Sequence, residues 1–228
     1  MPRCFLSAVG RDQPGIVAAV TGVLADRGCN LQDSSMTTLQ GQFAILLVVA
    51  VPEASSASSL ELALQPVAEQ FDLVVVVRSL PDDRPPAPEP PAASNAMPGD
   101  AKPSVAAASN AVPGHAQPSV PTGHAKRSPR PPAEPDVAPG ETAWVVAVHG
   151  ADHPGIVHGI ATVLAEAGGS IVDLTTHLVG DEPHPLYTLT MRAVIPSAVA
   201  ARTAELIEQA ARRLGVHCTV HDDPADVL

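Results

Sequence analysis

Two short segments of the chain combine residue types that suit the binding of a small anion. Both have the pattern Asp-x-Pro-Gly-Ile-Val, at residues 12–17 and 152–157. Pro loses no hydrogen bond when it begins a helix, and Gly lets another molecule approach the backbone closely. The N–H groups that follow point out of the helix start, where the helix dipole favours a carboxylate or another anion. The pattern therefore predicts an anion-binding turn in each segment.

The aspartate of this pattern has two interpretations. As a structural residue, Asp12 caps the helix by accepting its first N–H groups. As a binding residue, it lies near the start of the following strand, where Asn30 and Asp33 could hold an ammonium group. An anion site beside amide and carboxylate acceptors is complementary to the zwitterion of an amino acid. The residues of one copy leave both interpretations open.

A longer internal repeat contains both patterns, and its elements must position them. With an offset of 140, residues 10–33 and 150–173 are identical at 11 of 24 positions, which indicates a duplicated module. In the first copy, periodicity predicts a helix beginning at Pro14, a second helix over 58–70, and strands at 3–9, 31–39, 42–51 and 73–77. In the second copy it predicts helices at 154–167 and 199–214 and strands at 144–148, 170–179, 186–195 and 216–221. The βαββαβ order predicts an α+β fold with two ferredoxin-like domains, each with two helices on one face of four antiparallel strands.

Composition divides the chain into three parts. Sixteen of the 25 prolines fall between residues 81 and 139, and residues 81–140 contain no aromatic side chain. Such a segment cannot bury enough apolar surface to fold. We therefore expect a first domain at 1–80, a disordered Pro/Ala/Ser-rich linker at 81–140 and a second domain at 141–228.

Charge and cysteine content exclude several classes of protein. The formal net charge is −11 and no segment is strongly basic, which argues against direct binding to nucleic acid, because Lys and Arg must neutralise the phosphates. The three scattered cysteines form no zinc or disulfide pattern, and the N-terminus lacks the apolar core of a signal peptide. The longest apolar run, residues 43–52, is too short to cross a bilayer. The sequence predicts a cytoplasmic protein without a membrane anchor.

Other reactive side chains form no constellation for catalysis. Seven of the nine histidines lie in the second copy, where a metal site is conceivable. Solvated histidines are the favoured interpretation, because no cysteine or carboxylate completes a ligand set. No nucleophile elbow, P-loop or dinucleotide-binding glycine pattern follows a strand. We predict a protein that is not an enzyme and that uses no metal and no cofactor.

The strands of the two copies differ in their polarity. Residues 43–51 and 73–77 of the first copy are apolar at every position, whereas the corresponding strands of the second copy alternate. A sheet with helices on one face only should alternate. We predict that another protein surface covers the back of the first sheet, as in a homodimer formed through the sheets.

The stretch from Gly10 to Val17, followed by Gly28-Cys-Asn-Leu-Gln-Asp-Ser, resembles the ACT domain, an amino-acid-sensing regulatory module. Two such domains without an attached enzyme resemble the glycine cleavage system transcriptional repressor family. The resemblance covers all of the chain except the linker. It implies domains that pair side by side and a small amino acid, glycine or serine, bound at the domain interface. It also implies a protein partner, either a transcriptional regulator or a metabolic enzyme.

On this resemblance the ligand site falls on the first loop of each domain and the polar position that faces it. The expected ligand-binding residues are Asp12, Gln13, Pro14, Gly15, Ile16, Asn30, Asp33, Asp152, Pro154, Gly155, Ile156 and Ser170. The second copy departs from the pattern, because Ser170 stands where the first has Asn30 and Gly169 stands where the first has Cys29. We therefore expect ligand binding chiefly in the first copy. The alternative is a ligand-independent interaction module with degenerate pockets. A third possibility is the regulatory part of a split enzyme, because the same signature heads formyltetrahydrofolate deformylases. Nothing in this chain resembles the catalytic domain of those enzymes.

Overall fold

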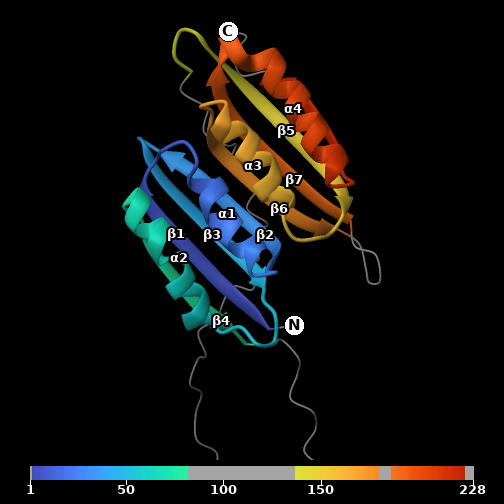
Figure 1. Ribbon diagram of the computed structural model, residues 1–228. Coiled ribbons are helices and arrows are strands. Elements are labelled where there is room, and N and C mark those ends of the chain that lie inside the picture. The colour runs from blue at the N-terminus through green and yellow to red at the C-terminus, as the bar shows by residue number, and fades with distance from the viewer. Residues whose placement is uncertain (1, 82–136, 180–185, 224–228) are drawn as a thin grey trace, which may run out of the picture. The chain divides into compact units, whose positions relative to one another are not determined.

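The computed structural model describes residues 2–81, 137–179 and 186–223 (Figure 1). Most of the expected linker, residues 82–136, and the long turn expected at 181–185 lie outside the described residues. The first module comprises β1 (Arg3–Arg11), α1 (Ile16–Asp26), β2 (Asn30–Leu39), β3 (Gln42–Ala50), α2 (Ala57–Phe71) and β4 (Val74–Leu80). The second comprises β5 (Glu141–Ala151), α3 (Ile156–Glu166), β6 (Ser170–Val179), β7 (Leu186–Pro196), a short 3-10 helix (Ser197–Val199), α4 (Ala200–Arg213) and β8 (His217–Asp222). The βαββαβ order expected from the sequence is therefore confirmed in both copies.

The described strands form one continuous eight-stranded sheet across both modules. Its order is β4-β1-β3-β2-β6-β7-β5-β8, and the two modules meet where β2 pairs antiparallel with β6. The helices all lie on one face of this sheet, and α1 contacts α3 across the boundary between the modules (Figure 1). The pairing of β2 with β6, which we call the seam, brings residues about 140 positions apart in the sequence into contact.

The helix starts differ in detail from the sequence expectation. α1 and α3 begin at Ile16 and Ile156, two residues after the proline, because Gly15 and Gly155 have φ values of 94° and 93°. Only glycine adopts this left-handed conformation without strain. Glycine is the N-cap of both helices and no side chain caps either one. The interpretation of Asp12 as a helix cap is therefore wrong.

The core lies between the sheet and the helices. Residues of β1 and β3 alternate, so that Leu6, Ile45 and Leu47 are buried under the helices. Equivalent positions in the second module are filled by Val146, Leu189 and Met191. These aliphatic side chains are small, but they belong to one apolar cluster that extends through both modules.

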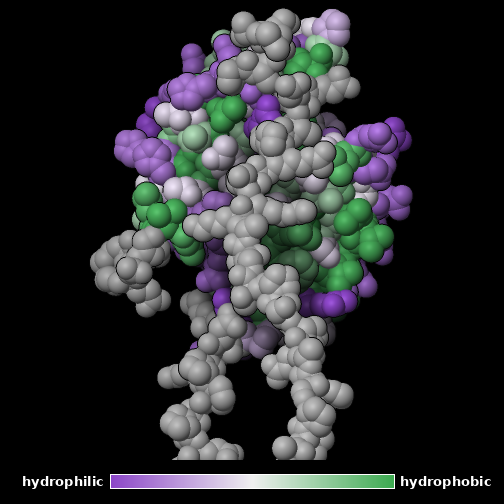
Figure 2. Space-filling model, turned by 180° about the vertical axis from the view of Figure 1, so that it is seen from behind, coloured by the Kyte–Doolittle hydropathy of each residue, from purple (hydrophilic) through white to green (hydrophobic). Residues whose placement is uncertain are grey.

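The opposite, outer face of the sheet changes character at the seam. In the first module Val9, Leu46 and Val74 are 46%, 47% and 69% exposed. In the second module, threonine, histidine and arginine occupy the outer positions of β7 and β8, from Thr188 to Arg192 and from His217 to His221. Figure 2 shows this face, with apolar surface gathered over part of it. The polarity difference expected from the strand patterns is therefore present, and the covering of the apolar half stays a prediction.

Candidate functional site

The two Asp-x-Pro-Gly turns face the partner module rather than their own. The Asn30 side chain donates from Nδ2 to Oδ2 of Asp152, over 2.6 Å. Reciprocally, the Ser170 hydroxyl donates to Oδ2 of Asp12, over 3.0 Å. Asn30 and Ser170 open the two strands of the seam, and each lies against the aspartate of the other module. The seam therefore generates two related sites, each assembled from both halves of the chain.

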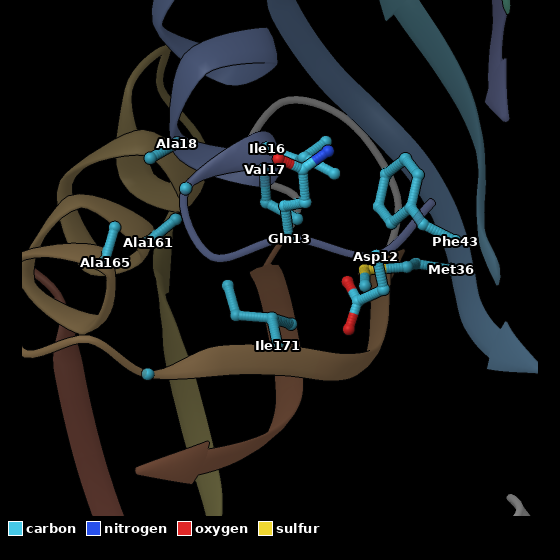
Figure 3. A pocket seen from close by; sticks show the side chains of 12 residues that line it. Asp12, Gln13, Ile16, Val17, Ala18, Met36, Phe43, Ala161, Ala165 and Ile171 are labelled. Carbon is cyan, nitrogen blue, oxygen red and sulfur yellow. The ribbon is translucent and has the colours of Figure 1, made fainter. Parts of the chain in front are cut away.

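The first pocket is built around the turn of the first module. Asp12, Gln13 and Gly15 line it from the turn, and Ala161, Ala165 and Ile171 line it from α3 and β6. Figure 3 shows α3 and Ile171 facing the turn that carries Gln13. Most of the remaining lining is apolar: Ile16, Val17, Ala18, Met36, Phe43 and Gly169. The pocket encloses about 260 Å³, including the part open to solvent.

Gly169 shapes this pocket. A β-carbon added at residue 169 would lie 2.5 Å from the Ile195 side chain, so a larger residue would require that side chain to move. The replacement of Cys29 by Gly169 in the second copy, noted in the sequence, is explained by this close approach.

The second pocket is built around the turn of the second module and has more polar residues in its lining. His153, Gly155 and His158 line it from the turn and α3, and Asn30 lines it from β2. Tyr187 of β7 completes it, together with Thr21, Leu24, Ala25, Cys29, Leu31, Ile156 and Val157. Its volume is about 290 Å³, again including the part open to solvent. Asn30 thus belongs to the pocket of the second turn. The sequence favoured the first copy as the ligand site because of Asn30, and the structure places this residue at the other site.

Two histidines hold the second turn and α3 in place. One ring nitrogen of His153 lies 2.7 Å from the carbonyl oxygen of Leu214, which follows α4. Nδ1 of His158 lies 3.0 Å from the Ala18 carbonyl on α1. His158 also packs on Gly22, where an added β-carbon would lie 3.0 Å from the ring. These contacts fix the spacing of α1 and α3 above the second pocket.

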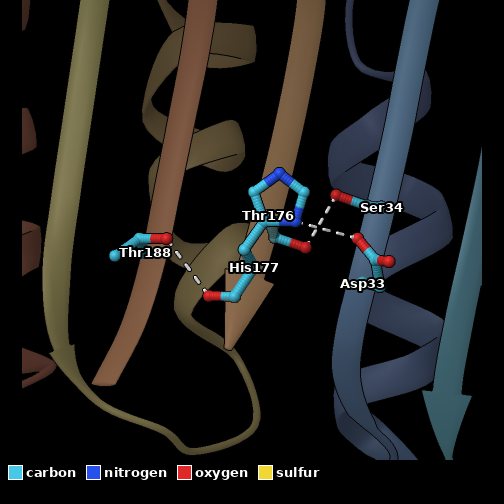
Figure 4. Close-up of polar contacts among 5 residues, drawn as sticks. All are labelled: Asp33, Ser34, Thr176, His177 and Thr188. Carbon is cyan, nitrogen blue, oxygen red and sulfur yellow. Dashed lines mark hydrogen bonds and ion pairs between the residues drawn. The ribbon is translucent and has the colours of Figure 1, made fainter. Parts of the chain in front are cut away.

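Asp33 lies away from both pockets. The register of β2 is shifted between Leu31 and Asp33, and Ser34 is buried, so that Asp33 projects to the outer face. There its carboxylate lies 3.3 Å from Nδ1 of His177 (Figure 4). The Ser34 hydroxyl donates to the Thr176 hydroxyl over 2.9 Å in the buried part of the seam. Asp33 and Asn30 therefore do not form one ammonium site, because Asn30 contacts Asp152 whereas Asp33 lies beside His177.

The carboxyl group of Asp12 has a raised pKa. Burial is the main cause, and hydrogen bonds from Ser170 and from the backbone of Gln13 oppose it. Asp12 therefore holds its proton in the folded state over a pH range where the unfolded chain has released it. Its contribution to stability falls as pH rises from its ordinary pKa of 3.8 through the raised value.

The Asp12→Asn substitution should consequently stabilise the protein at neutral pH. The amide oxygen still accepts from Ser170, and the penalty of burying a charge disappears. The gain in unfolding free energy, measured by urea denaturation, should be present at pH 7 and absent near pH 3. The exposed Glu61→Gln substitution on α2 controls for the change in net charge. An equal gain at both pH values would contradict this prediction.

Sequence reasoning missed several residues of the second pocket. Tyr187 is the second residue of β7, and the longer connection before β7 means that the simple offset of 140 does not align Tyr187 with Phe43. The register shows the equivalence, because Gly10 pairs with Phe43 and Gly150 pairs with Tyr187. His158 follows the second turn, and nothing in the sequence indicates that it reaches α1. These roles depend on strand and helix pairing.

The described part of the chain contains no cluster of three or more His, Cys, Asp and Glu residues arranged to hold a metal ion. His149 and His217 stack on the outer face with ring centroids 5.3 Å apart. No helix among the described residues is both long and apolar enough to span a bilayer.

Comparison with known proteins identifies the module. A family model for the ACT domain matches the chain twice, at residues 4–78 and 142–221. A UPF0237 protein of Methanopyrus kandleri is 37% identical over 79 residues, which are 34% of this chain and 88% of that protein. The glycine cleavage system transcriptional repressor of Escherichia coli is 30% identical over 84 residues, which are 36% of this chain and 44% of that protein.

Among solved structures, an ACT domain protein from Streptococcus pneumoniae is similar to one module. It is 28% identical with a TM-score of 0.32, and the match covers 34% of this chain and 89% of that one. The duplicated turn, the two matching modules and the side-by-side pairing through β2 and β6 lead to one conclusion. The chain belongs to the ACT domain family and contains two copies of the domain in one polypeptide.

Proposed function

We propose that this protein is a non-catalytic cytoplasmic regulator that binds a small amino acid between its two ACT domains and modulates a partner protein. The observation that carries the proposal is the reciprocal construction of the pockets. Each combines the helix start of one module with the strand start of the other. A ligand held there contacts both modules at once, which is the requirement for coupling binding to their arrangement.

The chemistry of the pockets suits a zwitterion. The starts of α1 and α3 carry no side-chain cap, so their first N–H groups and helix dipoles favour a carboxylate. The Asp12 and Asp152 carboxylates lie beside these starts and can accept hydrogen bonds from an ammonium group. Both pockets are small and lie between closely packed elements, so they suit the smallest amino acids. Glycine and serine are therefore the favoured ligands.

Regulation follows from differential affinity. A ligand that contacts both modules stabilises the paired arrangement, and it shifts an equilibrium only by the difference in its affinity for the two states. The partner then responds to the arrangement of the modules. The name of the related Escherichia coli repressor makes a transcriptional regulator the first candidate partner, and a metabolic enzyme is the second.

Ligand binding is tested by thermal unfolding of the full chain with each of the twenty amino acids at millimolar concentration. Glycine or L-serine at 100 times its Kd should stabilise the protein by about 2.7 kcal/mol, which corresponds to a rise in Tm of about 5–11 °C. Isothermal titration calorimetry with the same two amino acids then measures Kd. Unchanged melting temperatures with every amino acid would reject the ligand-sensing proposal.

A second candidate function is a ligand-independent interaction module, which the outer face of the first module favours. Val9, Leu46 and Val74 lie on neighbouring strands and are substantially exposed. A contiguous apolar surface of this kind is typical of a protein–protein interface. The occupant that we propose is a second copy of the chain, joined through the same face, because the strand pattern is apolar only in that half.

The Leu46→Lys substitution should abolish such a dimer. Leu46 is 47% exposed at the middle of the apolar half, and a buried lysine would leave an unpaired charge in the interface. Thr190→Lys is the matched control, since Thr190 holds the equivalent position in the polar half of the sheet. Sedimentation equilibrium should show a dimer for the wild type and for Thr190→Lys and a monomer for Leu46→Lys. A monomeric wild type at every concentration tested would exclude the homodimer.

A further inference from the structure

The two pockets share a backbone plan but differ in their polar side chains. Phe43 and Met36 line the first pocket. In the second module the equivalent positions are occupied by Tyr187 and Thr176, so that hydroxyl groups replace a phenyl edge and a thioether. The second pocket also has Asn30 beside its aspartate, whereas the first has Ser170.

Two buried oxygen atoms of the second site lack a hydrogen-bond partner among the described residues. They are Oδ1 of Asp152 and the hydroxyl of Tyr187. Tyr187 is only 2% exposed, and it lines the second pocket. A buried polar group without a protein partner is rare and costly in a native protein, so a bound group that pairs with it is stabilised at that position. The third such atom, the Thr38 hydroxyl, belongs to the first module and lines neither pocket.

The nearby hydroxyl of Thr176 does not satisfy Tyr187. Burial raises the pKa of Tyr187, the Thr176 side chain lowers it, and the Asp152 carboxylate raises it. Thr176 and Tyr187 nevertheless make no hydrogen bond of ordinary geometry. The Tyr187 hydroxyl therefore stays protonated and is available to donate to an oxygen atom of a ligand.

We infer that the ligand binds in the second pocket alone, one molecule per chain, and that Asp152 and Tyr187 select it. This inference rests on the proposed function and makes it more specific. Oδ1 of Asp152 accepts from the ammonium group of the ligand, while Oδ2 stays with Asn30. The Tyr187 hydroxyl donates to an oxygen of the ligand, and the uncapped start of α3 attracts its carboxylate. The first pocket has Phe43 at the position of Tyr187 and therefore no equivalent hydroxyl, and it serves as packing between α1, α3 and β6.

The test is calorimetric titration of the full chain with glycine, L-serine and glycolate. Glycolate has a hydroxyl in place of the ammonium group and should not bind, because it cannot neutralise Asp152. The wild type should bind glycine or L-serine with a stoichiometry of one per chain. Asp152→Asn should weaken binding about 10- to 100-fold, the loss expected for a charge-assisted hydrogen bond.

Tyr187→Phe separates a ligand-selecting role from a structural one. Removing a buried hydroxyl without a partner should leave the Tm of the ligand-free protein unchanged or raise it by a few degrees, while binding weakens about tenfold. Thr38→Val is the matched control, because it also removes a buried unpartnered hydroxyl. It should affect Tm in the same way and leave Kd unchanged.

Four results would overturn the inference in distinguishable ways. A stoichiometry of two, or unaltered affinity in Tyr187→Phe, would refute selection by the second pocket and leave amino-acid binding intact. An equal loss of affinity in Thr38→Val would show that the effect of Tyr187→Phe is not local. Absence of binding heat with both amino acids, together with unchanged melting temperatures, would reject the proposed function itself.

Discussion

Replacing Leu174 with alanine is expected to lower the free energy of unfolding by about 2–5 kcal/mol and to destabilise both modules together. Leu174 is fully buried on β6, and it lies opposite Met36 of β2 across the seam. The substitution leaves a cavity between the modules, where the surrounding strands are held from both sides and cannot close it. Because one sheet and one apolar cluster span the seam, the modules should unfold in a single transition.

The chain offers a direct measurement of this cooperativity. Its single tryptophan, Trp144, is buried in the second module, so fluorescence reports on that module alone. Far-ultraviolet circular dichroism reports on both modules. In urea, the two signals should change at the same midpoint in the wild type and shift together in Leu174→Ala. Val179→Ala is the control, since Val179 is 53% exposed at the end of the same strand and should change stability little.

Separate midpoints for the two signals would contradict unfolding in a single transition. If the fluorescence transition moved in Leu174→Ala while part of the dichroism transition stayed in place, the modules would fold independently. The ligand would then have to create the pairing of the modules rather than strengthen it.

The second large effect is expected for Asp223→Ala, which should destabilise the protein by about 3 kcal/mol. Asp223 is 5% exposed, and its Oδ2 lies 2.6 Å from Nη2 and 2.7 Å from Nε of Arg192. Removing the carboxylate leaves the guanidinium group buried without its closest counter-charge. The loss should lie at the lower end of the range for buried pairs, because Asp173 also interacts with Arg192.

Comparison with a surface pair shows whether burial causes this effect. Glu208 and Arg212 form an ion pair one helical turn apart on α4, with 3.4 Å between Oε2 and Nη1 and both side chains more than half exposed. Glu208→Ala should change the unfolding free energy by about 0.5 kcal/mol or less. In thermal unfolding, Asp223→Ala should therefore lower the Tm by about 6–12 °C and Glu208→Ala by only a degree or two. Similar shifts in the two variants would contradict the role assigned to burial.

Local patterns were sufficient to predict the elements of the fold. The strand from 170 to 179 was predicted with the bounds that the structure has, and α2 differs by one residue at each end. The strands predicted at 31–39 and 42–51 leave only Gln40 and Gly41 between them, and both residues have the positive φ values of a tight β-turn. These features depend on hydrophobic periodicity and turn chemistry within about fifteen residues. The helix starts were less accurate, because a left-handed glycine delays the first helical residue.

The composition of each pocket could not be predicted in the same way. The sequence placed Asn30 beside its own module's turn, and the structure places it against Asp152. It also grouped Asp33 with Asn30, although the shift in register turns Asp33 to the outer face. Both differences arise from the pairing of β2 with β6, whose partners are about 140 residues apart. No local pattern encodes which strand of one module will meet which strand of the other.

The sequence by itself determined that the chain has two copies of one module, each with a glycine-containing turn suited to an anion. It did so because the turn, the helix that follows and the alternation of the strands are properties of neighbouring residues. Only the tertiary structure decided which side chains face each turn, and it made the two sites unequal. The reason is physical: the register of β2 on β6 brings Asn30 to Asp152, and the pairing of β7 with β5 places the Tyr187 hydroxyl in the second pocket without a partner. The second Asp-x-Pro-Gly turn, which departs more from the family pattern, therefore has the pocket with more polar side chains in its lining.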